Sequence, residues 1–172
     1  FRPRISEEFY DNESDFDNVK NLINEPKHQA KIAELKAALR KKQLELFDSG
    51  LLPEAMRMRR AAANGITIYG MVRNKTLYPL EAYLDASDKA LARDAKNLED
   101  FVKAMSHQDE GIRWWAIVGL HLLEKDAASA NSTLKRALKD DCHEVRMMAA
   151  WSLVKLGDSD EALACLKDLL FN

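Results

Sequence analysis

The chain has 172 residues, of which 47% are hydrophobic and 31% charged, with a formal net charge of −2. This balance excludes wholesale disorder, and no apolar run in the sequence approaches the ~18 to 20 residues of a membrane span. Six glycines and four prolines, against abundant Ala, Leu, Lys and Glu, favour helices over strands. Two cysteines are too few for a disulfide framework.

The first predicted element is a short strand-like piece at Phe9-Tyr10, for which the sequence offers no second strand as a partner. Because the backbone groups of a strand need a hydrogen-bonding ladder, the piece is expected to belong to a sheet that lies upstream of this chain. The stretch from Asp17 to Ile23 predicts a short helical turn.

A long helix is predicted over residues 27–47, with Gly50 as its stop. A second helix is predicted from Pro53 to Asn64-Gly65. Helical spacing places four apolar residues on one face of the first helix: Ile32, Leu35, Leu39 and Leu46.

Residues 27–60 form a basic segment, with nine lysines and arginines against four acidic residues. Such a segment can attract a polyanion, for example a sulfated glycan. It can equally be the solvated face of amphipathic helices, or a surface that docks onto an acidic domain. No aromatic residue interrupts the clusters at residues 40–42 and 57–60, which disfavours stacking against nucleic acid bases. Neither nucleic acid nor a membrane is therefore an expected partner.

The second half contains an internal repeat with a constant offset between its two copies. Each unit is predicted to be a helix, a short polar turn that contains Asp, and a second helix that begins with Ile-Arg or Val-Arg. Gly157 is a predicted helix stop, and Asp158 with Glu161 predicts the start of a third unit. The offset aligns these pairs: Ile112 with Val145, Arg113 with Arg146, Ala116 with Ala149, and Leu120 with Leu153.

This pattern resembles HEAT repeats, in which helix pairs stack into a solenoid. The predicted fold is therefore all-α: antiparallel helix pairs forming a short HEAT-like α-solenoid, after a small N-terminal strand or loop remnant. Eight residues of the repeats are expected to be buried: Ile112, Ala116, Leu120, Leu123, Val145, Ala149, Leu153 and Leu156.

Three phrases between Phe9 and Glu81 resemble, in the same order, the closing segment of a bacterial sulfatase of the alkaline-phosphatase superfamily, of the heparan N-sulfatase or arylsulfatase type. Phe16 and Asn18 depart from the usual proline and glutamate of that segment. The matching residues are Phe9-Tyr10-Asp11, Glu13, Asp15 and Asn21-Leu22, then Gly50-Leu51-Leu52-Pro53-Glu54, then Tyr78-Pro79-Leu80-Glu81.

The resemblance implies that residues 1–90 are a sulfatase C-terminal subdomain remnant and that residues 91–172 are HEAT-like repeats attached to it. The chain would then be non-catalytic, and its first partner would be a missing upstream catalytic domain. That parent would hydrolyse sulfate esters or sulfamates of carbohydrates with calcium and a formylglycine, and would be periplasmic or secreted. The alternative is a free-standing helical-repeat scaffold that binds a protein or a polyanionic partner.

No catalytic, cofactor-binding or metal-ligating residue is predicted. The stretch from Cys142 to Arg146 has the Cys and Arg spacing of a formylglycine motif, but Glu144 stands where that motif needs Pro or Ala. The four histidines lack zinc-site spacing. The alternating carboxylates between Asp11 and Asp17 lack the glycine and glutamate of a calcium loop, and they favour a helix-entry turn.

The candidate interaction surface comprises Trp114, Met147, Arg57, Arg59 and Arg60, because interfaces are enriched in these residue types. Adjacent helical residues point about 100° apart, so Trp115 is expected to pack inward beside Ala116 while Trp114 stays partly exposed. The alternative is that the tryptophans fill the core or a groove between helices.

Overall fold

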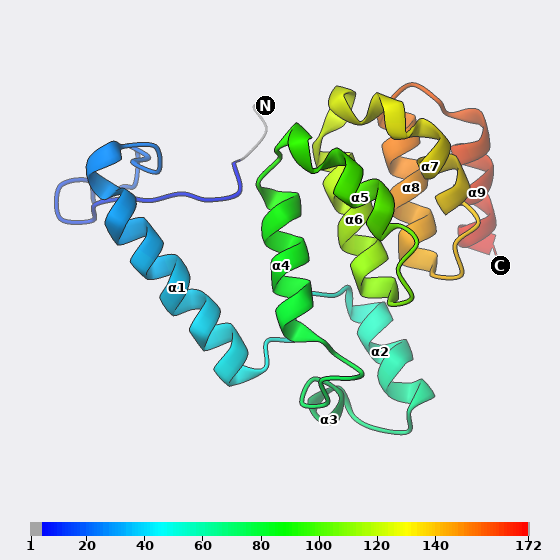
Figure 1. Ribbon diagram of the computed structural model, residues 1–172, viewed down its shortest axis with the longest axis horizontal. Helices are drawn as coiled ribbons and strands as arrows, with labels where there is room; N and C mark the ends of the chain where they lie inside the picture. The colour runs from blue at the N-terminus through cyan, green and yellow to red at the C-terminus, as the bar shows by residue number, and fades with distance from the viewer. Residues whose placement is uncertain (1–4, 172) are drawn as a thin grey trace. The chain divides into compact units, whose positions relative to one another are not determined.

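The computed structural model describes residues 5–171, and Figure 1 shows its helices. The chain divides into two compact units, residues 1–48 and residues 49–172. The predicted boundary between residues 90 and 91 falls inside the second unit. Every regular element among the described residues is helical, so the all-α prediction is confirmed.

The predicted strand at Phe9-Tyr10 is wrong, and no strand occurs among residues 5–171. The N–H of Phe9 donates to the side-chain oxygen of Asn21 at 3.0 Å, and the N–H of Leu22 donates to the carbonyl of Phe9 at 2.7 Å. Because these backbone groups are satisfied within the same unit, the segment needs no strand partner, and its extended sequence pattern does not imply an absent sheet.

The first unit contains a short 3-10 helix, η1 (Pro26–His28), and one long helix, α1 (Gln29–Leu46). The predicted stop at Gly50 is wrong: α1 ends earlier, because Phe47 adopts a left-handed conformation with a φ of 55°. Of the four apolar residues predicted to share a face, Ile32 is buried. The other three remain exposed: Leu35 by 49%, Leu39 by 60% and Leu46 by 72%.

The second unit begins with three helices, α2 (Glu54–Ala63), α3 (Ile68–Met71) and α4 (Leu80–Leu91). The helix α2 ends as predicted, because Gly65 takes a φ of 64° and the N–H of Ile66 closes the last turn onto Ala61 at 3.1 Å. The core beneath these helices holds Met56, Met71, Tyr78 and Tyr83, all of which are almost fully buried.

The repeats follow as η2 (Ala95–Asn97), α5 (Leu98–Ala104), α6 (Glu110–Leu122), η3 (Glu124–Ala130), α7 (Asn131–Ala137), α8 (His143–Lys155) and α9 (Asp160–Phe171). The bounds of α7 and α8 are those of α5 and α6 shifted by the offset that aligns Ile112 with Val145, as the internal repeat predicts. The helices α4, α6 and α8 pack in a row, while α5 packs on α6, and α7 and α9 pack on α8 (Figure 1).

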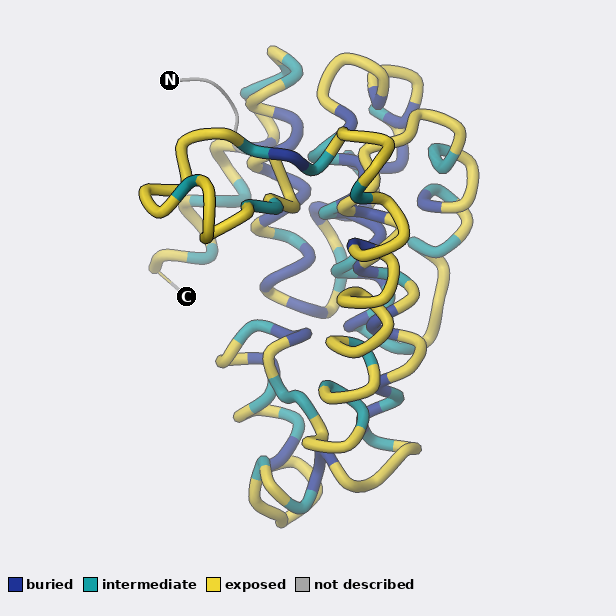
Figure 2. The backbone as a smooth tube through the Cα atoms, turned by 90° about the vertical axis from the view of Figure 1, so that its left-hand side faces the viewer, coloured by how far each residue is buried: buried dark blue, intermediate teal, exposed yellow. Residues whose placement is uncertain are grey.

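The apolar side of each repeat helix is buried where the helices pack together, and Figure 2 shows these buried segments along the helices. Six of the eight residues predicted to be buried are buried, including Ala149 and Leu153 at 0% exposure, while Ile112 and Leu156 are half-buried. Gly157 ends α8 with a φ of 87°, as predicted. Asp158 does not start α9; its carboxylate binds Asn131 at 3.2 Å and Lys135 at 2.7 Å.

Candidate interaction surfaces

Two of the three arginines predicted for the interaction surface are bound within the second unit. Arg59 on α2 forms an ion pair of 2.7 Å with Glu144, at the start of α8. Arg60 forms ion pairs with Asp109 at 3.2 Å and with Glu110 at 3.1 Å, where α6 begins. These contacts tie α2 to the first turns of both repeats, so the two guanidinium groups are not available as free positive charge.

Tyr83 on α4 completes the cluster around Arg60. Its hydroxyl donates to the carboxylate of Asp109 at 2.9 Å and accepts a short hydrogen bond from Arg60. Burial, followed by the nearby charge of Asp109, raises the pKa of Tyr83 well above its ordinary value. The hydroxyl therefore stays neutral and acts as a hydrogen-bond donor.

Arg57, the third predicted arginine, lies apart from this cluster. One of its Nη atoms donates to the hydroxyl of Ser49 at 3.0 Å, and its Nε is buried without a hydrogen-bond partner in the described part of the chain. The structure therefore does not bring Arg57, Arg59 and Arg60 together into one exposed basic patch.

The stretch from Cys142 to Arg146, which has the Cys and Arg spacing of a formylglycine motif, lies in this same region. The Cys142 side chain is 2% exposed, and its thiol donates to Glu144 at 3.1 Å. Burial is the largest cause that raises the pKa of Cys142, to about 12. A reactive cysteine needs access to solvent and a lowered pKa, so this environment does not fit a site of covalent chemistry.

The acidic stretch near the N-terminus uses its carboxylates to build turns. Asp11 accepts hydrogen bonds from the N–H of Glu13 and the hydroxyl of Ser14, and Asp15 accepts from the N–H groups of Val19 and Lys20. Within residues 5–171, no group of three or more His, Cys, Asp or Glu side chains is arranged to hold a metal ion.

Arg113 links the turn of the first repeat to the turn of the second. Its Nε and one Nη each donate to the Asp140 carboxylate at 2.8 Å, and its other Nη donates to the carbonyls of His107 and Gln108 at 3.0 Å. The hydrogen bonds to Asp140 are the largest cause that raises the pKa of Arg113. Arg146 occupies the same position in the second repeat, yet its Nε is buried without a hydrogen-bond partner among the described residues.

The helix α8 carries an exposed apolar stripe, formed by Met147, Trp151 and Val154, which we call the α8 stripe. These residues are 47%, 56% and 39% exposed, and their spacing places them on one side of the helix. Met147 belongs to the surface predicted from the sequence. Trp151 and Val154 were not predicted, although the helical period from Met147 could have indicated both.

The equivalent positions on α6 are Trp114, Val118 and His121, and all three are half-buried. The helix α8 contacts the last of these positions: His121 Nδ1 is 3.1 Å from the hydroxyl of Ser152, and the rings of His121 and Trp151 are 4.6 Å apart. Trp114 meets Trp115 edge to face at 4.8 Å. The same three positions are thus partly covered on α6 and exposed on α8.

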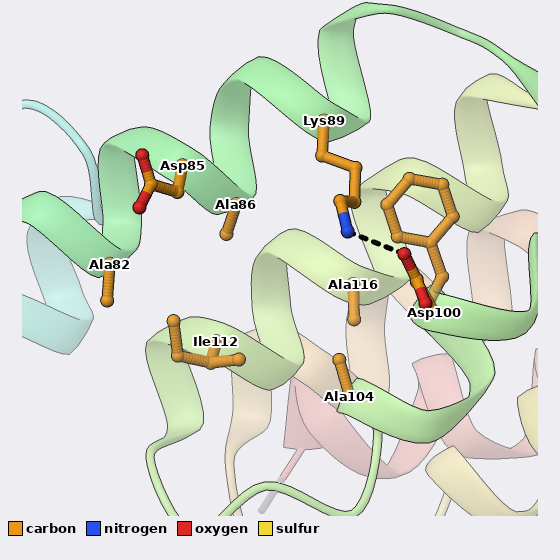
Figure 3. A pocket seen from close by; sticks show the side chains of 9 residues that line it. Ala82, Asp85, Ala86, Lys89, Asp100, Ala104, Ile112 and Ala116 are labelled. Carbon is orange, nitrogen blue, oxygen red and sulfur yellow. Dashed lines mark hydrogen bonds and ion pairs between the residues drawn. The ribbon is translucent and has the colours of Figure 1, made fainter. Parts of the chain in front are cut away.

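A second surface feature is a cavity of about 280 Å³ beside α4, α5 and α6 (Figure 3). Ile112 and Ala116 line it from α6, and an ion pair of 2.5 Å between Lys89 and Asp100 spans its edge. The repeat offset aligns Ala82 of this lining with the much larger Trp115. Most of the lining is alanine and other apolar surface, which offers few directional contacts to a small ligand.

Comparisons with known proteins agree with this geometry. Residues 98–171 match the family model described as HEAT repeats. Searches of curated proteins and of solved structures found no match to this chain. Among the described residues, no helix combines the length and the apolar character needed to cross a membrane. Residues 98–171 are therefore a HEAT-like helical-repeat module, a kind of fold that often mediates protein interaction.

Proposed function

We propose that this chain is a non-catalytic interaction module whose repeats bind a protein partner through the α8 stripe. The observation that carries the proposal is the exposure of Met147 and Trp151 on one side of α8, with Arg146 on the same helix. Exposed aromatic, Met and Arg side chains are enriched where proteins bind one another. A polyanionic partner is less well supported, because Glu144, Asp109 and Glu110 already neutralise Arg59 and Arg60.

The test begins with affinity capture from the cells that produce the protein, followed by binding measurements with each purified candidate partner. Trp151→Glu is expected to weaken binding at least about tenfold, because a charge in the centre of an apolar interface must be desolvated. Tyr69→Glu is the matched control, since Tyr69 is a comparably exposed aromatic residue on α3. A partner that binds both variants as tightly as the unmodified chain would contradict the proposal.

We further propose that the module belongs to a sulfatase-like hydrolase whose catalytic domain precedes it. Among residues 5–48, the buried apolar residues are Leu22 and Ile32. So small a core contributes little hydrophobic free energy to the folding of this unit. The exposed side chains of Leu35, Leu39 and Leu46 would bury further apolar surface if the unit docked onto a larger domain. The identity of that domain rests on the ordered sulfatase-like phrases of the sequence alone. The parent would hydrolyse sulfate esters or sulfamates of carbohydrates with calcium and a formylglycine, outside the cytoplasm.

The sulfatase proposal is tested on the complete gene product. The region encoded upstream is expected to contain Cys or Ser, any residue, Pro or Ala, any residue, then Arg. The complete protein is expected to hydrolyse an aryl sulfate in the presence of calcium, whereas residues 1–172 alone are not. Cys142→Ser in the complete protein is the control and should leave turnover unchanged. An upstream region without that motif, or activity that depends on Cys142, would contradict the proposal.

A further inference from the structure

We propose that the repeats bind a tetrahedral oxyanion, a sulfate or phosphate group, in a polar cavity beside the turns that follow α5 and α7. This inference goes beyond the proposed protein-binding function and does not depend on it. The cavity has a volume of about 230 Å³. Cavities that hold whole organic ligands usually measure about 300 to 1,000 Å³, so this one suits a single charged group. Its lining consists of Met105, Ser106, Thr133, Arg136, Ala137 and Asp140.

The lining combines residues from both repeats. Ser106 closes the last turn of α5, because its N–H donates to the carbonyl of Lys103 at 3.1 Å. Thr133 and Arg136 come from α7, and their spacing of three places both side chains on the same side of that helix. A ligand in the cavity would therefore contact the turn of the first repeat and the first helix of the second.

Arg136 supplies the positive charge of the cavity. One of its Nη atoms donates to the hydroxyl of Thr133 at 3.3 Å, and no carboxylate of residues 5–171 forms an ion pair with its guanidinium. By contrast, Arg59, Arg60 and Arg113 each bind a carboxylate within the same unit. Arg136 is also exposed, so an anion from solvent can reach it.

Two hydroxyl groups add neutral hydrogen-bond donors. Thr133 is 5% exposed, and its hydroxyl accepts from Arg136 while its proton has no acceptor among the described side chains and backbone. Leaving a buried donor unsatisfied costs free energy. The hydroxyl of Ser106 lies in the wall contributed by the first repeat. A guanidinium combined with hydroxyl donors suits the several acceptor oxygens of a sulfate or phosphate group.

Asp140 lines the same cavity, but its carboxylate is already engaged. It accepts two hydrogen bonds of 2.8 Å from Arg113 and one of 2.9 Å from the N–H of Cys142. Arg113 also pairs with Asp141. The charges of Arg113 and Arg136 thus balance those of the two aspartates. The donors that remain open favour an anion over a cation, and the affinity depends on directed hydrogen bonds rather than on a broad positive field.

The test follows the amide and arginine Nε signals of the whole chain by NMR during titration with sodium sulfate and with sodium phosphate. Sodium chloride at equal ionic strength is the reference, because screening alone can shift signals. We expect saturable changes at Ser106, Thr133 and Arg136 with sulfate or phosphate and none with chloride. A sulfate ester of glucose, titrated beside glucose, distinguishes the source of the anion. Tighter binding of the ester than of free sulfate would identify a sugar-borne group, and equal binding would identify the free ion.

Variants of the chain identify the groups responsible. Arg136→Gln should weaken binding at least about tenfold and Thr133→Val about threefold, since hydrogen bonds to charged groups are the stronger ones. Lys125→Gln is the control: it removes one exposed positive charge from η3 and should leave the affinity unchanged.

Circular dichroism verifies that each variant retains its helices. Signal changes equal to those caused by chloride, or binding that is undiminished in Arg136→Gln, would overturn the inference. If Arg136→Gln fails to fold, Thr133→Val decides, and an unchanged affinity in that variant would overturn it as well.

Discussion

Arg59 and Glu144 are separated by 85 residues in the sequence, and their side chains form an ion pair of 2.7 Å. This contact joins α2 to the first turn of α8 across the start of α6, where Arg60 binds Asp109 and Glu110. The helices before the repeats are thereby part of the same packed unit as the repeats. Several measurable properties of the protein depend on this relationship.

Removing Arg59 should destabilise the second unit. Arg59→Ala leaves Glu144, which is 8% exposed, without its counter-charge. After allowance for solvent near Arg59, the expected loss is roughly 1 to 2 kcal/mol in the free energy of unfolding, measured by urea denaturation. Lys89→Ala is the control, because Lys89 and Asp100 form an exposed pair; its unfolding midpoint should be nearly unchanged. Equal midpoints for both variants would show that the Arg59–Glu144 pair contributes nothing to stability.

The same pair should make stability depend on acid. Burial alone would raise the pKa of Glu144, but hydrogen bonds from Arg59 and Cys142 outweigh it and lower this pKa from 4.5 to about 2. A folded-state pKa below the unfolded value means that the ionised group stabilises the fold above about pH 4.5, and that this contribution is lost as the pH falls toward 2. Between about pH 4.5 and pH 2, the free energy of unfolding of the Glu144→Gln variant should therefore fall by roughly 1 to 2 kcal/mol less than that of the unmodified chain. Urea titrations at each pH measure the difference, and parallel acid dependence of the two proteins would contradict it.

The repeats should not fold well without α2 and α4. The indole N–H of Trp115 donates to the carbonyl of Leu51 at 2.8 Å, and α4 packs along α6. A fragment of residues 49–172 should unfold in one cooperative transition. A fragment of residues 91–172 should lose fixed tertiary packing and bind a hydrophobic dye, because the face of α6 beneath α4 becomes exposed. Equal cooperativity of the two fragments would instead support a domain boundary near residue 90.

Gly119 should be intolerant of a side chain. A Cβ at this position would lie 2.6 Å from the ring of Phe101, which is 3% exposed and cannot move freely. Gly119→Ala should cost roughly 1 to 3 kcal/mol by overpacking, despite the better helix propensity of alanine. Thermal unfolding measures the loss, and Phe101→Leu in the same chain should recover part of it. Gly70→Ala is the control, since its nearest neighbours would be 3.6 and 3.8 Å away.

The sequence by itself determined the helical class and the repeat. Composition and apolar spacing are local properties, and they predicted α1, α2 and the helices of the repeats. They did not predict α3 or α4, and the helical turn predicted from Asp17 to Ile23 does not form. The constant repeat offset, read from matches such as Ile112 with Val145, places α7 and α8 where they are found. The burial of Ala149 and Leu153 also follows from the sequence, because a residue's position around a helix depends only on its spacing from its neighbours.

Only the tertiary structure decided which surfaces are free. The sequence predicted an exposed basic cluster on α2. In the structure, however, Arg59 binds Glu144, which is 85 residues away, and Arg60 binds Glu110, which is 50 residues away. The sequence predicted a strand at Phe9, but the side chain of Asn21 and the N–H of Leu22 form hydrogen bonds with its backbone N–H and carbonyl. Such pairings depend on how distant segments pack, which helical periodicity does not encode. For the same reason, helical spacing alone did not reveal the exposure of Trp151, which contacts His121 on α6 and remains 56% exposed.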